Sequence, residues 1–283
     1  MMTLSPARLA PGTALFALLA LPVPAMAVHY DVEIRTSAGP VAGSRILTDF
    51  YGDLDLAGTL PIDALTGHKI YPGYFDDLEG GPNLTDDPGF QAFPGTFVPR
   101  EEIHFRALGT LAYWNPGVAA WADASAGSAI KLYGGIPNDV ALNYLLNPFD
   151  PAASAAYAHW ADGTRFTAAG VTGPISAVID DAKSDGAFHA HLDWELTNTS
   201  LTGVYLVTLQ LWSPAQVNGT AKYLDSDPFM VIFKSAGIAD SILADALDAR
   251  LAAPVPEPGA WAMLALGLPL VGWLAKRRRI IGA

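Results

Sequence analysis

The chain has 283 residues, of which 51% are hydrophobic and 16% are charged, so it can bury a sizeable core and is not disordered throughout. Its formal net charge of −12 at pH 7 argues against nucleic acid as a partner, because an acidic surface repels a phosphate backbone. The sequence contains no cysteine, which excludes disulfides, thiol nucleophiles and cysteine-ligated metal sites.

The first 27 residues have the three-part pattern of a secretory signal peptide. Arg8 precedes an uncharged apolar run over residues 13–24, and the small residues Ala25 and Ala27 occupy the two recognition positions of a signal peptidase site. We therefore expect export through the Sec machinery, cleavage after Ala27, and a mature chain that begins at Val28.

Residues 28–237 contain short runs of β-branched and aromatic residues separated by Gly, Pro, Asn and Asp, which is typical of all-β domains. The run 29–36 alternates apolar and polar residues, which predicts a strand with one buried and one solvated face. We expect further strands at residues 45–51, 103–114, 128–133, 165–169, 175–179, 187–197, 203–212 and 228–234. The sequence thus predicts a mainly β ectodomain, built as a two-sheet sandwich or a jelly roll.

Other segments of this domain show different patterns. The stretch 67–95 is dense in Gly and Pro and predicts a long ordered loop or several turns, whereas residues 139–146 predict a short helical insertion. Asn218 and Gly219 form a tight-turn signal. In residues 238–253, apolar residues recur at helical spacing, namely Ile238, Ile242, Leu243, Leu247 and Leu251. We expect this amphipathic helix either to dock on the domain or to form a stalk.

The strongest candidate site lies in the predicted strand 187–197. Alternation there directs the apolar side chains into the core and places four polar side chains on the opposite face, namely His189, His191, Asp193 and Glu195. Two histidines at i and i+2 stand about 7 Å apart along a strand, so both imidazoles can lean onto one metal ion. His29 and Asp31, on the polar face of the first strand, are the expected additional ligands.

This pattern predicts one divalent transition metal, because neutral imidazole suits Zn, Cu, Ni or Fe. The competing interpretations are a solvated strand face with incidental histidines, and a catalytic site. His68, His104 and His159 are reserve ligands. Calcium is the less favoured ion, and its candidate ligands, which equally suit a solvated turn, are Asp76, Asp77, Glu79, Asn83, Asp86 and Asp87.

The C-terminal region has the pattern of a membrane anchor. Residues 259–275 are uncharged and apolar, which predicts a single membrane-spanning helix of about 25 Å at about 1.5 Å per residue. The residues before this span are Val255, Pro256, Glu257 and Pro258, and those after it are Lys276, Arg277, Arg278 and Arg279. The basic cluster predicts a cytoplasmic C-terminus and an exported N-terminal domain.

This order of Pro-Glu-Pro, apolar span and basic cluster resembles the PEP-CTERM sorting signal of Gram-negative bacteria that make exopolysaccharide. The resemblance covers residues 254–279 and leaves 280–283 as a tail. It implies recognition by exosortase, transient insertion in the inner membrane, and processing near residues 256–258. The product would then reach the cell surface or the extracellular matrix.

The ectodomain shows a second resemblance, carried by His189-x-His191, Trp194 and the later Gly203-Val204-Tyr205, together with the early His29-x-Asp31. These short motifs are similar to strands of bacterial choice-of-anchor surface-protein domains. The resemblance implies an anchored surface domain with a role that could involve a metal.

We therefore expect an exported cell-surface or matrix protein, associated with exopolysaccharide and biofilm, whose role is structural or binding. The alternative is a metal-binding domain that uses the His-x-His strand, and a secreted hydrolase is a distant third. Enzymatic activity is not expected, because the sequence has no nucleophile elbow, phosphate-binding loop, dinucleotide fingerprint or His-Glu-x-x-His motif.

Overall fold

The computed structural model describes residues 30–52, 60–75, 81–197 and 202–251. Several predicted features lie outside these residues, namely the signal peptide 1–27, His29, the acidic residues Asp76, Asp77 and Glu79, the sorting signal 254–279 with its span 259–275, and the tail 280–283. Within the described ranges, no helix is both long and apolar enough to cross a membrane.

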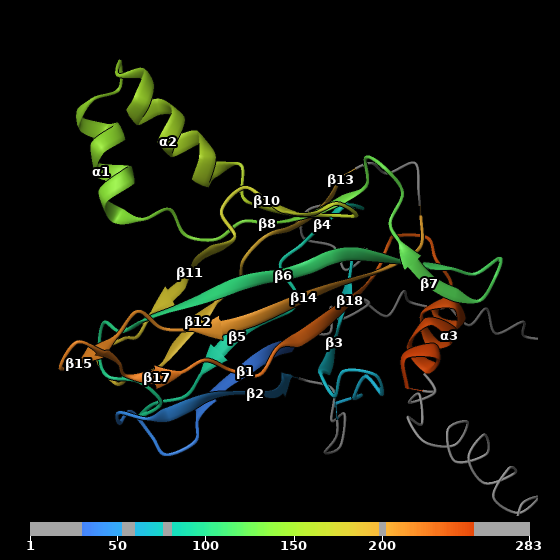
Figure 1. The fold of residues 1–283 in the computed structure, drawn as a ribbon, viewed down its shortest axis with the longest axis horizontal. Coiled ribbons are helices and arrows are strands. Elements are labelled where there is room, and N and C mark those ends of the chain that lie inside the picture. Colours follow the sequence, from blue (N-terminus) through green and yellow to red (C-terminus); the bar gives the residue numbers. More distant parts are fainter. Residues whose placement is uncertain (1–29, 53–59, 76–80, 198–201, 252–283) are drawn as a thin grey trace, which may run out of the picture.

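The described chain is mainly β, as the sequence predicts (Figure 1). Its strands form three larger sheets, where the sequence predicted two. The first sheet has the order β12 (Phe188–Ala190), β5 (Gly89–Ala92), β1 (Tyr30–Thr36), β2 (Ser44–Gly52) and β17 (Tyr223–Leu224). The second has the order β10 (Gly170–Thr172), β9 (Thr164–Thr167), β8 (Ala129–Leu132), β13 (Trp194–Thr197) and β4 (Leu84–Thr85).

The third sheet carries the longest strands. Its order is β11 (Ser176–Asp181), β6 (Glu102–Asn115), β14 (Val204–Trp212), β18 (Phe229–Lys234) and β3 (Lys69–Tyr74), and β7 (Ala120–Asp123) pairs with β6. The predicted strands appear with ends shifted by no more than two residues, apart from the strand 187–197. The turn signal at Asn218 and Gly219 lies in a small hairpin of β15 (Gln216–Val217) and β16 (Thr220–Ala221), where both residues have positive φ.

Two sequence predictions are corrected. The stretch 67–95 is not only a loop, because its described part contains β3, β4 and β5, which hydrogen-bond to strands distant in sequence. Gly and Pro keep β4 and β5 short without preventing this pairing. The predicted strand 187–197 is two strands, since β12 pairs with β5 in the first sheet and β13 pairs with β8 in the second.

Two helices form a hairpin that projects from the sheets, α1 (Asn138–Leu146) and α2 (Pro151–Ala161) (Figure 1). The prediction of a helix at 139–146 is confirmed as α1. The helix α2 is not among the predicted elements, although its start carries a clear signal. Asp150 caps the helix by accepting a hydrogen bond from the Ala152 backbone N–H at 2.9 Å, and Pro151 occupies the first turn.

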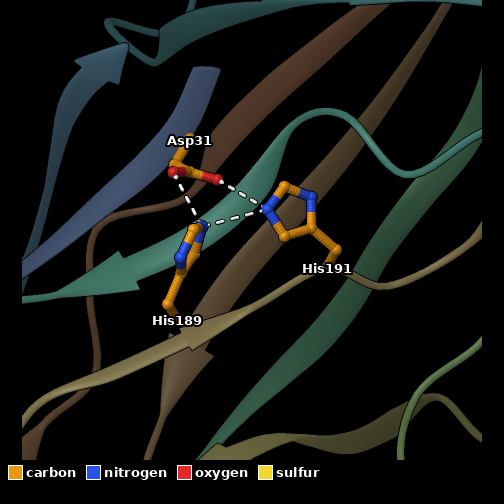
Figure 2. A group of neighbouring side chains, drawn as sticks. All are labelled: Asp31, His189 and His191. Carbon is orange, nitrogen blue, oxygen red and sulfur yellow. Dashed lines mark hydrogen bonds and ion pairs between the residues drawn. The ribbon is translucent and has the colours of Figure 1, made fainter. Parts of the chain in front are cut away.

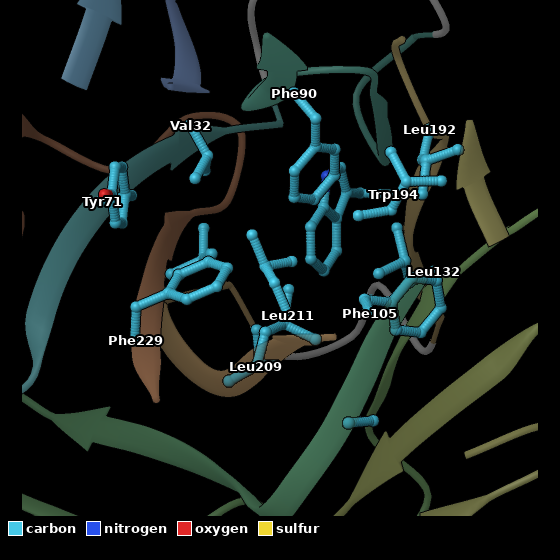
Figure 3. Close-up of a cluster of buried hydrophobic side chains, with 14 of the residues drawn as sticks. Val32, Tyr71, Phe90, Phe105, Leu132, Leu192, Trp194, Leu209, Leu211 and Phe229 are labelled. Carbon is cyan, nitrogen blue, oxygen red and sulfur yellow. The ribbon is translucent and has the colours of Figure 1, made fainter. Parts of the chain in front are cut away.

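The main hydrophobic core draws on all three larger sheets (Figure 3). Val32 from β1, Phe105 from β6 and Leu132 from β8 belong to one cluster of fully buried side chains. Burying a side chain of this size stabilises the fold by roughly 1.5–3 kcal/mol. This single core therefore fixes the three sheets relative to one another.

The third sheet is covered on both faces where α3 packs against it. Alternate residues of β14 point to opposite sides, so Val207 and Leu209 enter the main core while Val204 and Leu206 enter a second cluster under the helix α3 (Asp240–Leu251). The Trp121 indole N–H donates to the Ala246 carbonyl oxygen at 3.0 Å. The described part of the predicted C-terminal helix thus docks on the domain.

A matched pair of phenylalanines tests this core. We expect Phe105→Ala to lower the free energy of unfolding by about 3–5 kcal/mol, because it leaves a cavity where Phe105 is fully buried. Phe149→Ala should leave stability within about 0.5 kcal/mol of the parent, because Phe149 is 97% exposed. Urea titration followed by circular dichroism measures both, and equal effects would contradict the assigned core.

Candidate metal centre

Two described histidines and one carboxylate meet at the edge of the first sheet (Figure 2). β5 lies between β12 and β1, antiparallel to the first and parallel to the second. Asp31 pairs with Gly89 across the β1–β5 ladder, and His191 follows directly after the end of β12. Strand pairing therefore brings together residues about 160 positions apart in the sequence.

The three side chains lie within contact distance of one another. His189 Nε2 is 3.0 Å from His191 Nε2 and 3.3 Å from Asp31 Oδ2. His191 Nε2 is 3.7 Å from Asp31 Oδ1. Two donors that each lie about 2.0–2.2 Å from a tetrahedral ion are separated by about 3.3–3.6 Å. The observed separations bracket this range, so the two imidazoles and the carboxylate fit around one ion.

Gly89 makes this approach sterically feasible. A Cβ atom added at Gly89 would lie 2.3 Å from Asp31 Oδ1 and 2.8 Å from His191 Cε1, closer than real Cβ atoms approach other heavy atoms. Glycine is the one residue that keeps the space between the two flanking strands empty at this register. The site thus depends on Gly89, although Gly89 itself contributes no ligand atom.

The site is open on one side. The Asp31 side chain is fully buried, that of His191 is 22% exposed, and that of His189 is 42% exposed. A metal ion with three protein ligands and solvent on one side keeps its fourth coordination position for water or another small ligand. An ion held here could exchange with the surroundings.

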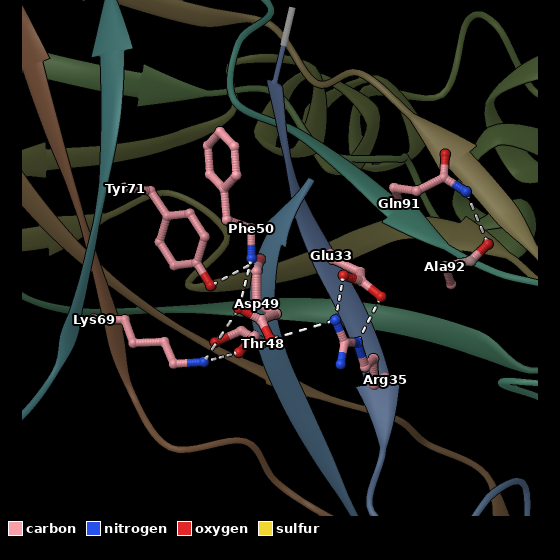
Figure 4. Close-up of polar contacts among 9 residues, drawn as sticks. All are labelled: Glu33, Arg35, Thr48, Asp49, Phe50, Lys69, Tyr71, Gln91 and Ala92. Carbon is pink, nitrogen blue, oxygen red and sulfur yellow. Dashed lines mark hydrogen bonds and ion pairs between the residues drawn. The ribbon is translucent and has the colours of Figure 1, made fainter. Parts of the chain in front are cut away.

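The two carboxylates on the polar face of β1 are buried while Arg35 is exposed, which corrects the prediction that the whole face is solvated. Asp31 is 0% and Glu33 7% exposed. The Glu33 carboxylate accepts two hydrogen bonds from the Arg35 guanidinium, at 2.6 and 2.7 Å (Figure 4). On the neighbouring strand β2, the carbonyl oxygen of Asp49 accepts a hydrogen bond from the hydroxyl of Tyr71 on β3, and burial raises the pKa of Tyr71 above its ordinary value. Because neighbouring side chains cover this face, its carboxylates are buried despite the alternating sequence.

The second ring nitrogen of His191 faces the loop that precedes β5. His191 Nδ1 lies 3.2 Å from the Asp86 carbonyl oxygen, 3.4 Å from Asp86 Oδ2 and 3.6 Å from Asp87 Oδ1. A carbonyl oxygen only accepts hydrogen bonds, so the Nδ1 atom carries the proton in this arrangement. His191 Nε2 then presents its lone pair towards Asp31 and His189, as a metal ligand requires.

The structure brings together His189, His191 and Asp31 from the predicted set. The reserve histidines lie elsewhere: His104 is on β6 beside Glu102, His159 is on α2, and His68 precedes β3. Asp86 and Asp87 had been predicted only as calcium or turn residues, and they face His191 instead. Asp86 and Asp87 directly precede β5, and only the pairing of β5 with β1 and β12 brings them close to His191. The sequence gives no local signal for that pairing.

Asp193 and Glu195 do not share the face of the two histidines, contrary to the sequence prediction. The chain leaves the first sheet after Ala190 and enters the second at Trp194, so the alternation does not continue on one surface. The Glu195 carboxylate accepts a hydrogen bond from the hydroxyl of Tyr133, which directly follows β8 of the second sheet. The pKa of Tyr133 is raised, mainly by burial of its hydroxyl and next by this hydrogen bond to Glu195.

Comparisons of the chain with protein-family models, with curated proteins and with solved structures find no match.

The steric role of Gly89 can be tested by substitution. We expect Gly89→Ala to weaken binding of Zn²⁺ or Co²⁺ by about 10–100-fold, because the new methyl group displaces Asp31 or His191. Isothermal titration calorimetry measures the affinity. Gly117→Ala is the control, because Gly117 is exposed and the closest atom to its added Cβ is the Asn115 side-chain oxygen at 3.2 Å. An unchanged affinity in folded Gly89→Ala would contradict the steric role.

Proposed function

We propose that the described domain binds a divalent transition metal through Asp31, His189 and His191. The observation that carries this proposal is the convergence of His189 Nε2, His191 Nε2 and the Asp31 carboxylate within 3.0–3.7 Å. Two imidazoles favour Zn²⁺, Cu²⁺, Ni²⁺ or Fe²⁺ over Ca²⁺ and Mg²⁺, which prefer oxygen ligands. The partial exposure of His189 supports a role in metal capture or delivery, because three protein ligands leave the fourth position of a tetrahedral ion open to solvent, whereas a structural site fills all four with protein ligands.

We propose further that this domain belongs to an exported protein sorted by exosortase. The support is the sequence pattern at both ends, a signal peptide with Ala25 and Ala27, and a Pro-Glu-Pro motif followed by an apolar span and a basic cluster. The same proposal includes the membrane helix 259–275, a sandwich or jelly-roll grouping of the sheets, and a final place at the cell surface or in a matrix of exopolysaccharide.

Metal content tests the first proposal. The full chain, exposed to Zn²⁺ and freed of loosely bound ions, should retain metal at near-stoichiometric or higher levels. The double variant His189→Ala, His191→Ala should lose that metal, because it removes both nitrogen ligands. Elemental analysis by plasma mass spectrometry provides the measurement.

The matched control is His159→Ala, which removes an exposed imidazole on α2 and should leave metal content unchanged. Equal metal content in the parent and the double histidine variant would reject the site. Absence of metal from the parent would identify the histidines as part of an ordinary strand edge.

The sorting proposal makes an independent prediction. Replacing Lys276, Arg277, Arg278 and Arg279 with glutamine should abolish retention in the membrane and the C-terminal processing, because the basic cluster orients the span. Fractionation and mass spectrometry of the mature C-terminus report both effects. Lys183→Gln, in the described domain, is the charge control. Unchanged retention and processing in the cluster variant would overturn the sorting proposal.

A further inference from the structure

The loop before β5 presents three oxygens to one nitrogen of His191. The Asp86 carbonyl oxygen, Asp86 Oδ2 and Asp87 Oδ1 all lie 3.2–3.6 Å from His191 Nδ1. A single N–H cannot make a well-directed hydrogen bond to three acceptors at once. A cation in this position can interact with all of them, and the separations of these oxygens from Nδ1 are close to the spacing of about 3.3–3.6 Å between two ligands of a tetrahedral ion.

This group of atoms sits on a well-fixed loop. The Asp87 backbone N–H donates to the buried Thr85 hydroxyl at 3.1 Å. The buried Trp194 indole N–H donates to the Pro88 carbonyl oxygen at 3.4 Å. These two bonds hold the loop on both sides of Asp87, whose side chain is only 8% exposed. The Asp87 carboxylate is therefore positioned by the core, whereas the Asp86 side chain is 33% exposed and can be reached from solvent.

The two nitrogens of His191 face two separate ligand groups. Nε2 faces Asp31 and His189, whereas Nδ1 faces Asp86 and Asp87. Together, the three carboxylates carry three negative charges, of which one divalent ion would offset two. Two divalent ions carry four positive charges, which three ionised carboxylates and a His191 ring deprotonated to imidazolate would balance.

We infer that the centre holds two divalent transition metal ions, with the His191 ring bridging them. The inference rests on the proposed function, because the first ion is the one bound by Asp31, His189 and His191. Asp86 and Asp87 are the carboxylate ligands of the second ion. Binding of that ion displaces the proton from His191 Nδ1 to solvent, so the ring becomes an imidazolate. The two ions would lie about 6 Å apart, each about 2.0–2.1 Å from its ring nitrogen.

The experiment uses the full chain and Cu²⁺ as the probe ion. Equilibrium dialysis followed by plasma mass spectrometry should find two ions per chain, and one ion in the double variant Asp86→Asn, Asp87→Asn. The matched control is Asp180→Asn, Asp181→Asn, an adjacent pair on β11 that makes the same change in charge. That control should retain two ions.

Electron paramagnetic resonance then distinguishes a bridged pair from two separate sites. At two equivalents of Cu²⁺, magnetic coupling through the imidazolate should suppress most of the signal expected from two isolated ions. In Asp86→Asn, Asp87→Asn, the remaining ion should give a full signal. The spectrum of the parent protein alone shows whether the two ions are magnetically coupled. The test therefore remains valid even if the Asp86→Asn, Asp87→Asn variant does not fold.

Three results would overturn the inference. Uptake of one ion by the parent, with an affinity about 10–100-fold lower in Asp86→Asn, Asp87→Asn, would show that these carboxylates only orient His191, while the proposed function stands. Two ions with additive signals would show independent sites. Uptake of no ion by the parent would reject the second ion and the proposed function together.

Discussion

The approach of Asp31 and His191 across the bare backbone of Gly89 is the contact on which the candidate centre depends. Neighbouring strands are about 4.7–4.9 Å apart, so residues on β1 and beyond β12 are separated by two such steps. A side chain on the middle strand would fill the gap. Since Gly89 has none, the carboxylate and the imidazole reach over it to within 3.7 Å.

The same contact ties the site to the core. The chain passes from the first sheet to the second between Ala190 and Trp194, and Leu192 and Trp194 are anchored in the main hydrophobic cluster. His191 lies in this crossing, where its ring meets both β1 and the loop before β5. Burying the Asp31 carboxylate would cost several kcal/mol without compensation, and His189 Nε2, 3.3 Å away, is a polar group close enough to offset part of that cost. Packing and site formation are therefore coupled through residues 190–194.

Much of the fold follows from local pattern. Alternation located β1, runs of β-branched and aromatic residues located β6, β14 and β18, and helical spacing located α3, because each of these patterns reflects side chains that the core covers. What escaped prediction depends on pairing between distant segments. β3 and β5 lie in a Gly- and Pro-rich stretch, and only their parallel partners β18 and β1 identify them as strands.

The candidate site shows the same division. The His-x-His motif and the polar face of the first strand were sufficient to predict His189, His191 and Asp31, because imidazole and carboxylate groups at that spacing suit a metal. The break of the strand after Ala190 was not predictable from alternation, since the burial pattern of residues 188–196 continues across it. For this reason Asp193 and Glu195 were placed wrongly, and Asp86 and Asp87 were not linked to the histidines.

X-ray absorption spectroscopy of the full chain loaded with one equivalent of Co²⁺ or Zn²⁺ tests the central claim most directly. The account predicts imidazole scattering, with nitrogen ligands about 2.0–2.1 Å from the ion, and its loss in the variant that lacks both His189 and His191. A coordination shell made only of oxygen, or an unchanged spectrum in that variant, would contradict it.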